Sequence, residues 1–314
     1  MLTALAGGVG AARFLRGLVQ VVEPSAVTVV VNTADDDEFH GLWVSPDLDS
    51  VTYTLAGAHD AERGWGLAGE TFAAVDALGR YGADTWFRLG DRDLATHLYR
   101  TQRLRAGVPL GAVTAEITRA WRLETRLLPM SDERVATRIT VRAGDGTPLE
   151  LSMQEWFVRD RAEPPVVAVR FEGAADARPG PGVLDALQSA DTIVICPSNP
   201  VISVAPILAV PGIRAILERR RDVVVGVSPI VGGAPVKGPA DRLMAPLGID
   251  VSCVGVAREY ASICRSLVID ERDAARAPEI AALGVTPVVC NTVMTDERVA
   301  AVLARHALDA ASAA

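Results

Sequence analysis

The chain has 314 residues, 49% of them hydrophobic, which is enough for a large α/β domain with a substantial core. A net charge of −8 and a pI near 5.1 argue against binding to nucleic acid or a membrane surface, because both need a concentrated basic face. No apolar run approaches the roughly 18 residues of a membrane span, and Met1 leads into a strand without a basic signal region. We therefore expect a cytoplasmic protein with a small-molecule partner.

The first predicted unit is a strand, a glycine turn and a helix. Leu2 to Ala6 is apolar, Gly7-Gly8-Val9-Gly10 follows, and Ala11 to Val22 has the apolar spacing of a helix. Glycines at such a turn let a phosphate approach the backbone at the helix N-terminus. The pattern departs from a dinucleotide fingerprint, because Arg13 stands at the third glycine position, and no Walker motif occurs. A nucleotide-phosphate site and a simple tight turn both remain open.

The second strand leads into a strongly acidic stretch. Val27 to Val31 is predicted as a buried parallel strand, Asn32-Thr33-Ala34-Asp35-Asp36-Asp37 follows directly, and Pro46-Asp47-Leu48-Asp49 comes a few residues later. Carboxylates massed at a strand end repel one another, so their pKa values rise unless a cation or a hydroxyl-rich ligand is bound. Mg²⁺ would relieve that repulsion and also hold a phosphate. The alternative is a solvated loop whose Asp residues cap helices.

Residues 85–97 alternate positive and negative charges around a glycine. Arg88 and Arg92 are suited to forked contacts with the oxygens of an anion such as phosphate. Asp91 or Asp93 would, in the simpler interpretation, cap the helix that follows. The sequence leaves both interpretations open.

Two insertions and a series of strands complete the chain. A helical cap is predicted for about residues 52–130. A β-hairpin is predicted within about residues 135–172, where Thr137 to Val141 and Leu149 to Met153 alternate in polarity. The other expected elements are strands at Val166–Phe171, Thr192–Cys196, Val223–Val227, Val251–Val256 and Val288–Cys290, and helices ending before Asp191, over Pro206–Arg220, and from Thr295 or Asp296 towards Leu308.

The unusual loops each follow a predicted strand. They are the glycine turn, the acidic stretch, Pro197-Ser198-Asn199-Pro200, and the loop from Gly232 to Gly238 that contains Lys237, the single lysine of the chain. In a parallel sheet such loops share the carboxyl edge, where open α/β folds bind ligands. Two glycine loops and a lysine at this edge suit a diphosphate, and the carboxylates suit a cation beside it. A flexible surface loop is the alternative for Gly232 to Gly238.

Seven motifs lie in one order over nearly the whole chain: Gly7-Gly8-x-Gly10, Val31–Ala34, Ser45–Val51, Leu89–Asp93, Leu128–Asp132, Pro197–Pro200 and Ser228–Ile230. Together they resemble the 2-phospho-lactate transferases (CofD/FbiA) of coenzyme F420 biosynthesis. The resemblance implies one Rossmann-like three-layer αβα domain over residues 1–314, with a mainly parallel sheet and the two insertions. It also implies a homodimer and magnesium dependence.

The resemblance implies a reaction as well. The terminal ribityl hydroxyl of the deazaflavin Fo attacks the phosphorus nearest the three-carbon acid of a guanosine diphosphate-linked donor, and GMP leaves. The implied product is dehydro-F420-0 or F420-0, according to whether the donor carries enolpyruvate or lactate. No residue decides between these donors, and the GC-rich, actinobacterial-looking composition favours enolpyruvate by association only.

The site residues that the resemblance implies fall into three groups. Asp49 and Arg88, with Asp91 and Arg92, are expected to contact the deazaflavin, and Asp47 or Asp49 is expected to be catalytic. Asp36 and Asp47 are the magnesium candidates. The guanylate side is expected to be lined by Gly8, Gly10, Asn32, Ser198, Asn199, Gly233 and Lys237.

Two other functions compete with this one. A non-catalytic nucleotide-sugar sensor resembling YvcK would use a similar glycine turn, but Asp47-Leu48-Asp49 and Gly90-Asp91-Arg92-Asp93 favour the transferase. A nicotinamide-dependent oxidoreductase rests only on the glycine turn and Asp35, and the missing third glycine argues against it.

Overall fold

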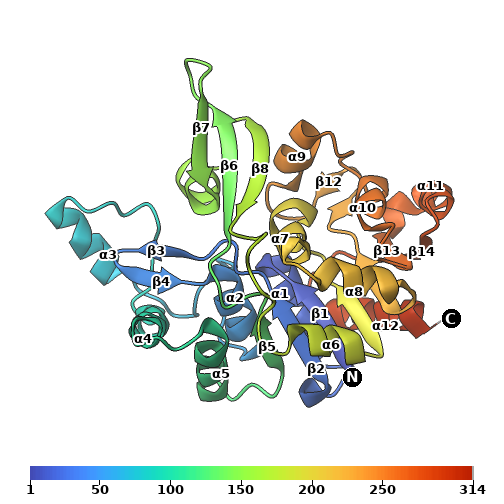
Figure 1. The fold of residues 1–314 in the computed structure, drawn as a ribbon, viewed down its shortest axis with the longest axis horizontal. Helices are drawn as coiled ribbons and strands as arrows, with labels where there is room; N and C mark the ends of the chain where they lie inside the picture. Colours follow the sequence, from blue (N-terminus) through green and yellow to red (C-terminus); the bar gives the residue numbers. More distant parts are fainter. Residues whose placement is uncertain (313–314) are drawn as a thin grey trace.

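The computed structural model describes residues 1–312 and is built around a parallel sheet of seven strands (Figure 1). The order across the sheet is β14-β13-β10-β9-β1-β2-β5, and every neighbouring pair is parallel. In chain order the strands are β1 (Leu2–Ala6), β2 (Val27–Val31), β5 (Arg126–Pro129), β9 (Thr192–Ile195), β10 (Val224–Val227), β13 (Ser266–Asp270) and β14 (Thr286–Cys290).

Helices cover both faces of this sheet, which gives the predicted three-layer αβα arrangement. The strands are continuous apolar runs because a parallel sheet is buried on both sides, and all five residues of β1 and of β2 are buried. One face packs against α1 (Gly8–Leu18), α2 (Pro46–Leu55) and α12 (Glu297–Ser312). The other packs against α6 (Val183–Ser189), α7 (Ala205–Ala209), α8 (Ile213–Arg219) and α10 (Cys253–Tyr260).

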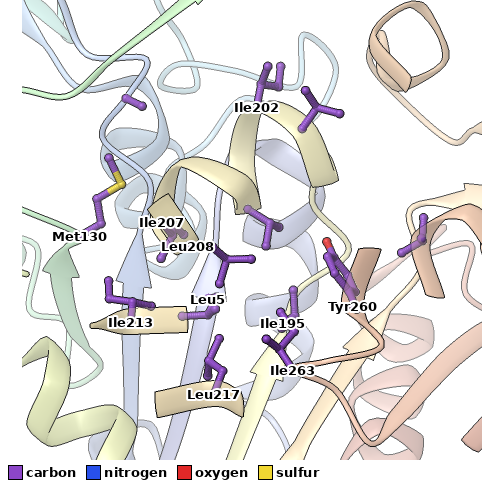
Figure 2. Close-up of a cluster of buried hydrophobic side chains, with 14 of the residues drawn as sticks. Leu5, Met130, Ile195, Ile202, Ile207, Leu208, Ile213, Leu217, Tyr260 and Ile263 are labelled. Carbon is purple, nitrogen blue, oxygen red and sulfur yellow. The ribbon is translucent and has the colours of Figure 1, made fainter. Parts of the chain in front are cut away.

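Figure 2 shows part of the second layer. Leu5 and Ile195 from the strands lie in one cluster with Ile207, Ile213 and Leu217 from α7 and α8. The remaining helices are α3 (Ala73–Leu78), α4 (Leu94–Arg105), α5 (Leu110–Ala120), α9 (Ala240–Met244) and α11 (Ala277–Ala282). Within residues 1–312 no single helix is long and apolar enough to cross a membrane, and one bent pair, Pro200–Ala209 with Ile213–Arg219, meets the criteria of length and composition.

Three small antiparallel sheets accompany the main one. The predicted hairpin is confirmed as β6 (Ala136–Arg142) and β7 (Pro148–Ser152), and β8 (Val166–Glu172) pairs along the other edge of β6. This three-stranded sheet stands out from the body of the protein (Figure 1). The other two are short hairpins: β3 (Asp37–Phe39) with β4 (Leu42–Val44), and β11 (Ile230–Val231) with β12 (Ala234–Pro235).

Three expectations about secondary structure differ from the structure. The helix expected over Pro206–Arg220 is divided into α7 and α8. Residues 251–256 were expected to form a strand, but Cys253 begins α10, where the Ser252 hydroxyl accepts a hydrogen bond from the Gly255 amide at 3.1 Å. The sheet strand is instead β13, which was not predicted. The helical cap expected over 52–130 also ends earlier, because β5 is the edge strand of the main sheet.

Candidate active site at the switch point of the sheet

The glycine turn lies at the point where the strand order reverses. Counted along the chain, the seven parallel strands have the spatial order 3-2-1-4-5-6-7, so the direction in which successive strands are added reverses between β1 and β9. Ligands of open α/β sheets bind outside the carboxyl ends of the strands at this point. The turn after β1 and the turn after β9 face each other there, because the Ser198 hydroxyl donates a hydrogen bond to the Gly7 carbonyl at 2.9 Å.

Close packing explains why this turn is made of glycine. A Cβ on Gly10 would lie 2.5 Å from the Pro197 carbonyl oxygen, and one on Gly7 would lie 2.7 Å from Ser203 Cβ. Gly8 instead has space around it but a φ of +74°, a conformation that L residues rarely adopt. Glycine is required here for two physical reasons, close packing at Gly7 and Gly10 and positive φ at Gly8. The helix α1 begins at Gly8, within the turn and earlier than the predicted Ala11.

Asp47 joins the glycine turn to the acidic stretch. It lies in the first turn of α2, where one carboxylate oxygen accepts a hydrogen bond from the Gly8 amide at 2.8 Å. The other oxygen accepts from the Asn32 side-chain amide at 2.9 Å, and the same Asn32 nitrogen donates to Asp35 at 3.2 Å. Asn32 is fully buried at the end of β2. The predicted Gly8, Asn32 and Asp47 therefore meet in one hydrogen-bonded group.

Four carboxylates crowd this group with almost no exposure to water. Asp35, Asp36, Asp47 and Asp49 each expose 7% or less of their surface. Burial, reinforced by the neighbouring Asp47 carboxylate, raises the pKa of Asp35 well above its usual range, and burial does the same for Asp36. Burial raises the pKa of Asp47 to about 6. The cluster is thus unfavourable in its fully ionised form without a compensating cation.

The cluster fits a hard cation in its donor chemistry. Asp35 Oδ1 and Asp36 Oδ1 are buried and accept no hydrogen bond, while Asp36 Oδ2 accepts one from the Ser45 hydroxyl at 2.6 Å. Mg²⁺ is commonly held by one or two carboxylates, with water and substrate phosphate completing its shell. No group of three or more His, Cys, Asp or Glu side chains within residues 1–312 is arranged to hold a metal by itself. A site shared with a substrate is the arrangement that these residues suit.

Asp49, which also lies in the first turn of α2, belongs to a second buried network. Arg100 of α4, 2% exposed, donates to both of its carboxylate oxygens, one of them at 3.0 Å. His97 lies between two carboxylates, with Nε2 3.2 Å from Asp93 and Nδ1 3.8 Å from Asp49. The Tyr53 hydroxyl donates to Asp93. Sequence reasoning missed Arg100, which was hidden in a helix with several other basic residues.

Arg88, Asp91 and Arg92 lie on one loop and make local contacts. Arg88 pairs with Asp76 at 2.8 Å and lies over the Phe72 ring at 4.7 Å. Asp91 accepts hydrogen bonds from two backbone amides of α3, each at 2.9 Å, and from the Thr71 hydroxyl. These bonds lower the pKa of Asp91. Asp91 therefore caps α3 and not α4, and Asp93, the N-cap residue of α4, makes no cap hydrogen bond with its side chain, so the expected capping of α4 by Asp91 or Asp93 is wrong.

The remaining predicted residues line the same edge further along. Asn199 accepts hydrogen bonds from the Val201 and Ile202 amides, which cap a short π-helical segment. Gly233 has a φ of +79° in the β11–β12 turn. Lys237 comes so close to Gly64 that a Cβ there would lie 2.5 Å from its ammonium nitrogen. Partial burial and the nearby Arg13 lower the pKa of Lys237.

Comparison with known proteins identifies a consistent set of relatives. The family described as 2-phospho-L-lactate transferase CofD matches residues 2–306. A protein of Streptomyces griseus named phosphoenolpyruvate transferase is 47% identical over 98% of this chain and 97% of its own length. The protein of that name from Mycolicibacterium smegmatis is 41% identical over 99% and 98%.

Solved structures support the fold. Two crystal structures of BH3568 from Bacillus halodurans, each 20% identical in sequence, align with TM-scores of 0.57 and 0.61. The second covers 98% of both chains and is described as a member of the upf0052 family. At this level of identity the similarity concerns the fold alone.

Proposed function

Since this chain belongs to the CofD family, and so to the transferases of coenzyme F420 biosynthesis, we propose that it transfers a phospho-enolpyruvyl group to the deazaflavin Fo. The donor is a guanosine diphosphate-linked enolpyruvate, and the products are GMP and dehydro-F420-0. The observation that carries the choice of enolpyruvate over lactate is the full-length similarity to proteins named phosphoenolpyruvate transferase, at 47% identity in two Streptomyces species.

The proposed step is a phosphoryl transfer at the switch point. The terminal ribityl oxygen of Fo forms a bond to the phosphorus nearest the enolpyruvyl group, and the bond from that phosphorus to the bridging oxygen of GMP breaks. The hydroxyl proton passes to a carboxylate. Of the two catalytic candidates, Asp47 suits this role better, because its hydrogen-bond donors, the Gly8 and Asn32 amides, are neutral, whereas the Arg100 cation donates to both oxygens of Asp49. We assign to Asp49 the positioning of the first turn of α2.

We further propose that Asp36 and Asp47 hold Mg²⁺. The unpartnered Asp36 Oδ1 and the raised pKa values of both carboxyls support this assignment. When bound, the ion supplies positive charge that offsets the phosphate oxygens of the donor. Asp47 orients the donor by holding the glycine turn through the Gly8 amide.

The guanylate side of the site follows the loops at the sheet edge. We propose that the turn at Gly8 and Gly10 and the facing Ser198 and Asn199 accommodate the diphosphate, because backbone amides at a helix N-terminus favour anions. Asn32 fixes the Asp47 carboxylate beside them. Gly233 and Lys237 line the outer part, where the ammonium group attracts phosphate.

The test combines binding and turnover. Purified protein is titrated with Fo, following deazaflavin fluorescence with and without Mg²⁺, and then supplied with the enolpyruvyl or the lactyl donor while GMP is measured. Saturable Fo binding with GMP released from the enolpyruvyl donor supports the proposal. Release of GMP from the lactyl donor alone would show that the donor carries lactate and not enolpyruvate. Absence of Fo binding together with binding of a UDP-sugar would favour the sensor.

We also propose a cytoplasmic homodimer, as the family resemblance implies. Sedimentation of the purified protein tests the oligomeric state directly. A single species of 33.1 kDa at all concentrations would contradict it.

A further inference from the structure

Five buried polar side chains form one chain of contacts between α2 and α4. Each of them exposes 8% or less of its surface. Removing so many polar groups from water costs free energy unless every group has a partner, so such networks hold their members in one arrangement. The members are Asp49 and Tyr53 on α2, Asp93 directly before α4, and His97 and Arg100 on α4.

Asp93 takes part in this network in place of capping its own helix. It is the N-cap residue of α4, but its side chain makes no cap hydrogen bond. The carboxylate instead accepts a hydrogen bond from the Tyr53 hydroxyl, and Glu70 accepts one from the Asp93 amide at 2.8 Å. A missing side-chain cap typically costs about 1 kcal/mol. The carboxylate is therefore held inside by what it meets there, the hydroxyl of Tyr53 and the ring of His97.

The contacts of His97 fix which of its ring nitrogens carries the proton. Nδ1 lies 3.4 Å from Nη1 of Arg100. A guanidinium group only donates hydrogen bonds, so Nδ1 must be the acceptor and the proton lies on Nε2. Nε2 faces Asp93 Oδ2 at 3.2 Å, without the alignment of a full hydrogen bond. Asp49 lies 3.8 Å from Nδ1, beyond hydrogen-bond distance, so it does not replace Arg100 there.

His97 gives the Arg100 side chain a third point of support. Nη1 donates both to Nδ1 of His97 and to Asp49 Oδ2, the latter at 3.0 Å, while Nη2 donates to Asp49 Oδ1. The Arg100 Nε is buried and has no hydrogen-bond partner within residues 1–312. Forked arginine–carboxylate contacts depend on the orientation of the planar guanidinium. Because Nε is not held, the His97 ring sets that orientation together with Asp49 itself.

The orientation of Arg100 reaches the proposed chemistry through α2. Asp49 and Asp47 both lie in the first turn of this helix, and Asp47 accepts a hydrogen bond from the Gly8 amide at 2.8 Å. A displacement of Asp49 after a lost contact therefore shifts the turn that carries Asp47. Such shifts matter for turnover, since a misplacement of about 1 Å can lower a rate about 100-fold.

We propose that His97 is a positioning residue of the transfer reaction. It accepts a hydrogen bond from Arg100, so that Arg100 holds Asp49 and the first turn of α2 keeps Asp47 at the glycine turn. The inference rests on the function proposed above, in which Asp47 takes the hydroxyl proton. His97 is outside the set of site residues predicted from the sequence, and it is 1% exposed, so it acts without touching a substrate.

Two amide variants separate the two sides of the His97 ring. His97→Asn places an amide oxygen near the position of Nδ1, which keeps an acceptor for Arg100. His97→Gln extends its amide to the position of Nε2, which keeps a polar group facing Asp93 but removes the acceptor. His306→Gln, at an exposed position of α12, is the matched control. For each full-length variant, kcat and donor KM are measured from GMP release, and thermal melting reports stability.

We expect His97→Gln to lower kcat at least about tenfold and His97→Asn to stay within about threefold of the wild type. Both should lose a similar amount of melting temperature, because each leaves one buried contact unmade. Donor KM should change far less than kcat, since the Ser198 hydroxyl also holds the glycine turn. His306→Gln should match the wild type throughout. Equal losses of kcat in the two His97 variants, or unchanged kcat in both, would overturn the proposal.

Ring-nitrogen NMR gives a second readout that does not depend on turnover. The chain has four histidines, so the signals of His97 in protein labelled with nitrogen-15 histidine are identified by their absence from His97→Gln. The wild type should show His97 protonated on Nε2 alone, and a proton on Nδ1 would overturn the proposal. In an active enzyme, equal kcat losses in the two variants contradict the positioning role alone. If the wild type releases no GMP with Fo from either donor, the proposed function fails and the positioning role fails with it.

Discussion

At the scale of single residues, Asp47 is a carboxylate whose burial opposes its ionisation. Its pKa is raised from 3.8 to about 6, mainly by burial. Between about pH 4 and 6 the folded chain therefore keeps a proton on Asp47 that the unfolded chain has already released. Without a bound cation, the free energy of unfolding should therefore fall as the pH rises through this range and stay lower above it. The stabilisation that this bound proton gives to the folded state is present in full only below about pH 4.

Asp47→Asn should consequently stabilise the protein at pH 7.5 while reducing turnover. Removing a carboxyl whose pKa is raised by about two units gives an upper limit of about 3 kcal/mol. The N–H that then faces one of the two amide donors of Gly8 and Asn32 lowers the gain, and we expect about 1 kcal/mol. Urea unfolding with EDTA at pH 4.5 and pH 7.5 measures the effect. A variant that is less stable than the wild type at pH 7.5, or that unfolds with the same pH dependence, would contradict the burial argument.

Arg100 is the buried counterpart of the acidic cluster. Arg100→Met would leave Asp49 as an unpaired buried charge, so a loss of about 3–5 kcal/mol in the free energy of unfolding is expected. Arg103→Met, three residues along α4, breaks the solvent-screened pair with Glu116 and should cost far less. Denaturant titration of both variants gives the comparison, and equal losses would refute it. Adding Asp49→Asn to Arg100→Met should restore part of the stability.

The residues that sequence reasoning placed correctly are those whose chemistry follows a strand end. Asn32 and Asp47 stand in polar or acidic runs after β2, so their convergence with Gly8 was predictable. Arg100 was not, because one arginine among several on α4 carries no local mark of burial. Its role depends on which face of α4 packs against α2, which is a property of tertiary structure.

At the scale of elements, the glycine turn is constrained in two ways, by close packing at Gly10 and by backbone conformation at Gly8. Gly10→Ala places a Cβ 2.5 Å from the Pro197 carbonyl, so the turns after β1 and β9 must move apart. Gly8→Ala meets no close atom but retains a φ of +74°, which costs about 1–2 kcal/mol. We therefore expect Gly10→Ala to raise donor KM severalfold more than Gly8→Ala. Steady-state kinetics with unfolding controls measure both, and the reverse order would exclude a role for turn spacing.

The elements themselves were predictable where the apolar pattern was unambiguous. β1, β2, β9, β10 and β14 are apolar runs after turn residues, and each lies within two residues of its predicted position. The apolar segment 251–256 has the same composition, but the Ser252 cap makes it the start of α10. A short apolar run cannot distinguish a buried strand from a buried helix, so capping had to decide. β5 was hidden because it is short, lies at the edge of the sheet and ends in Pro129.

At the scale of the whole molecule, the strand order explains how residues distant in the chain form one site. The first strand lies in the interior of the sheet, between β2 and β9, so the loops after three strands meet around the N-terminus of α1. The sequence predicted the shared edge, because parallel strands place their carboxyl ends together. It did not predict which loops are neighbours, because the order of strands depends on the packing of helices on both faces.

A cation bound only by the folded arrangement should stabilise the entire molecule. If Mg²⁺ is present at about 100 times its dissociation constant, the gain is about 2.7 kcal/mol, which for a chain of this size corresponds to roughly 3–5 °C in melting temperature. The shift should be larger at pH 7.5 than at pH 5, because protonated carboxyls with raised pKa values do not bind metal. Asp36→Asn should abolish it, whereas Glu124→Gln, at an exposed position away from the cluster, should not. Thermal melting with and without Mg²⁺ measures the shift. An equal shift in the wild type and Asp36→Asn would place the cation elsewhere on the molecule.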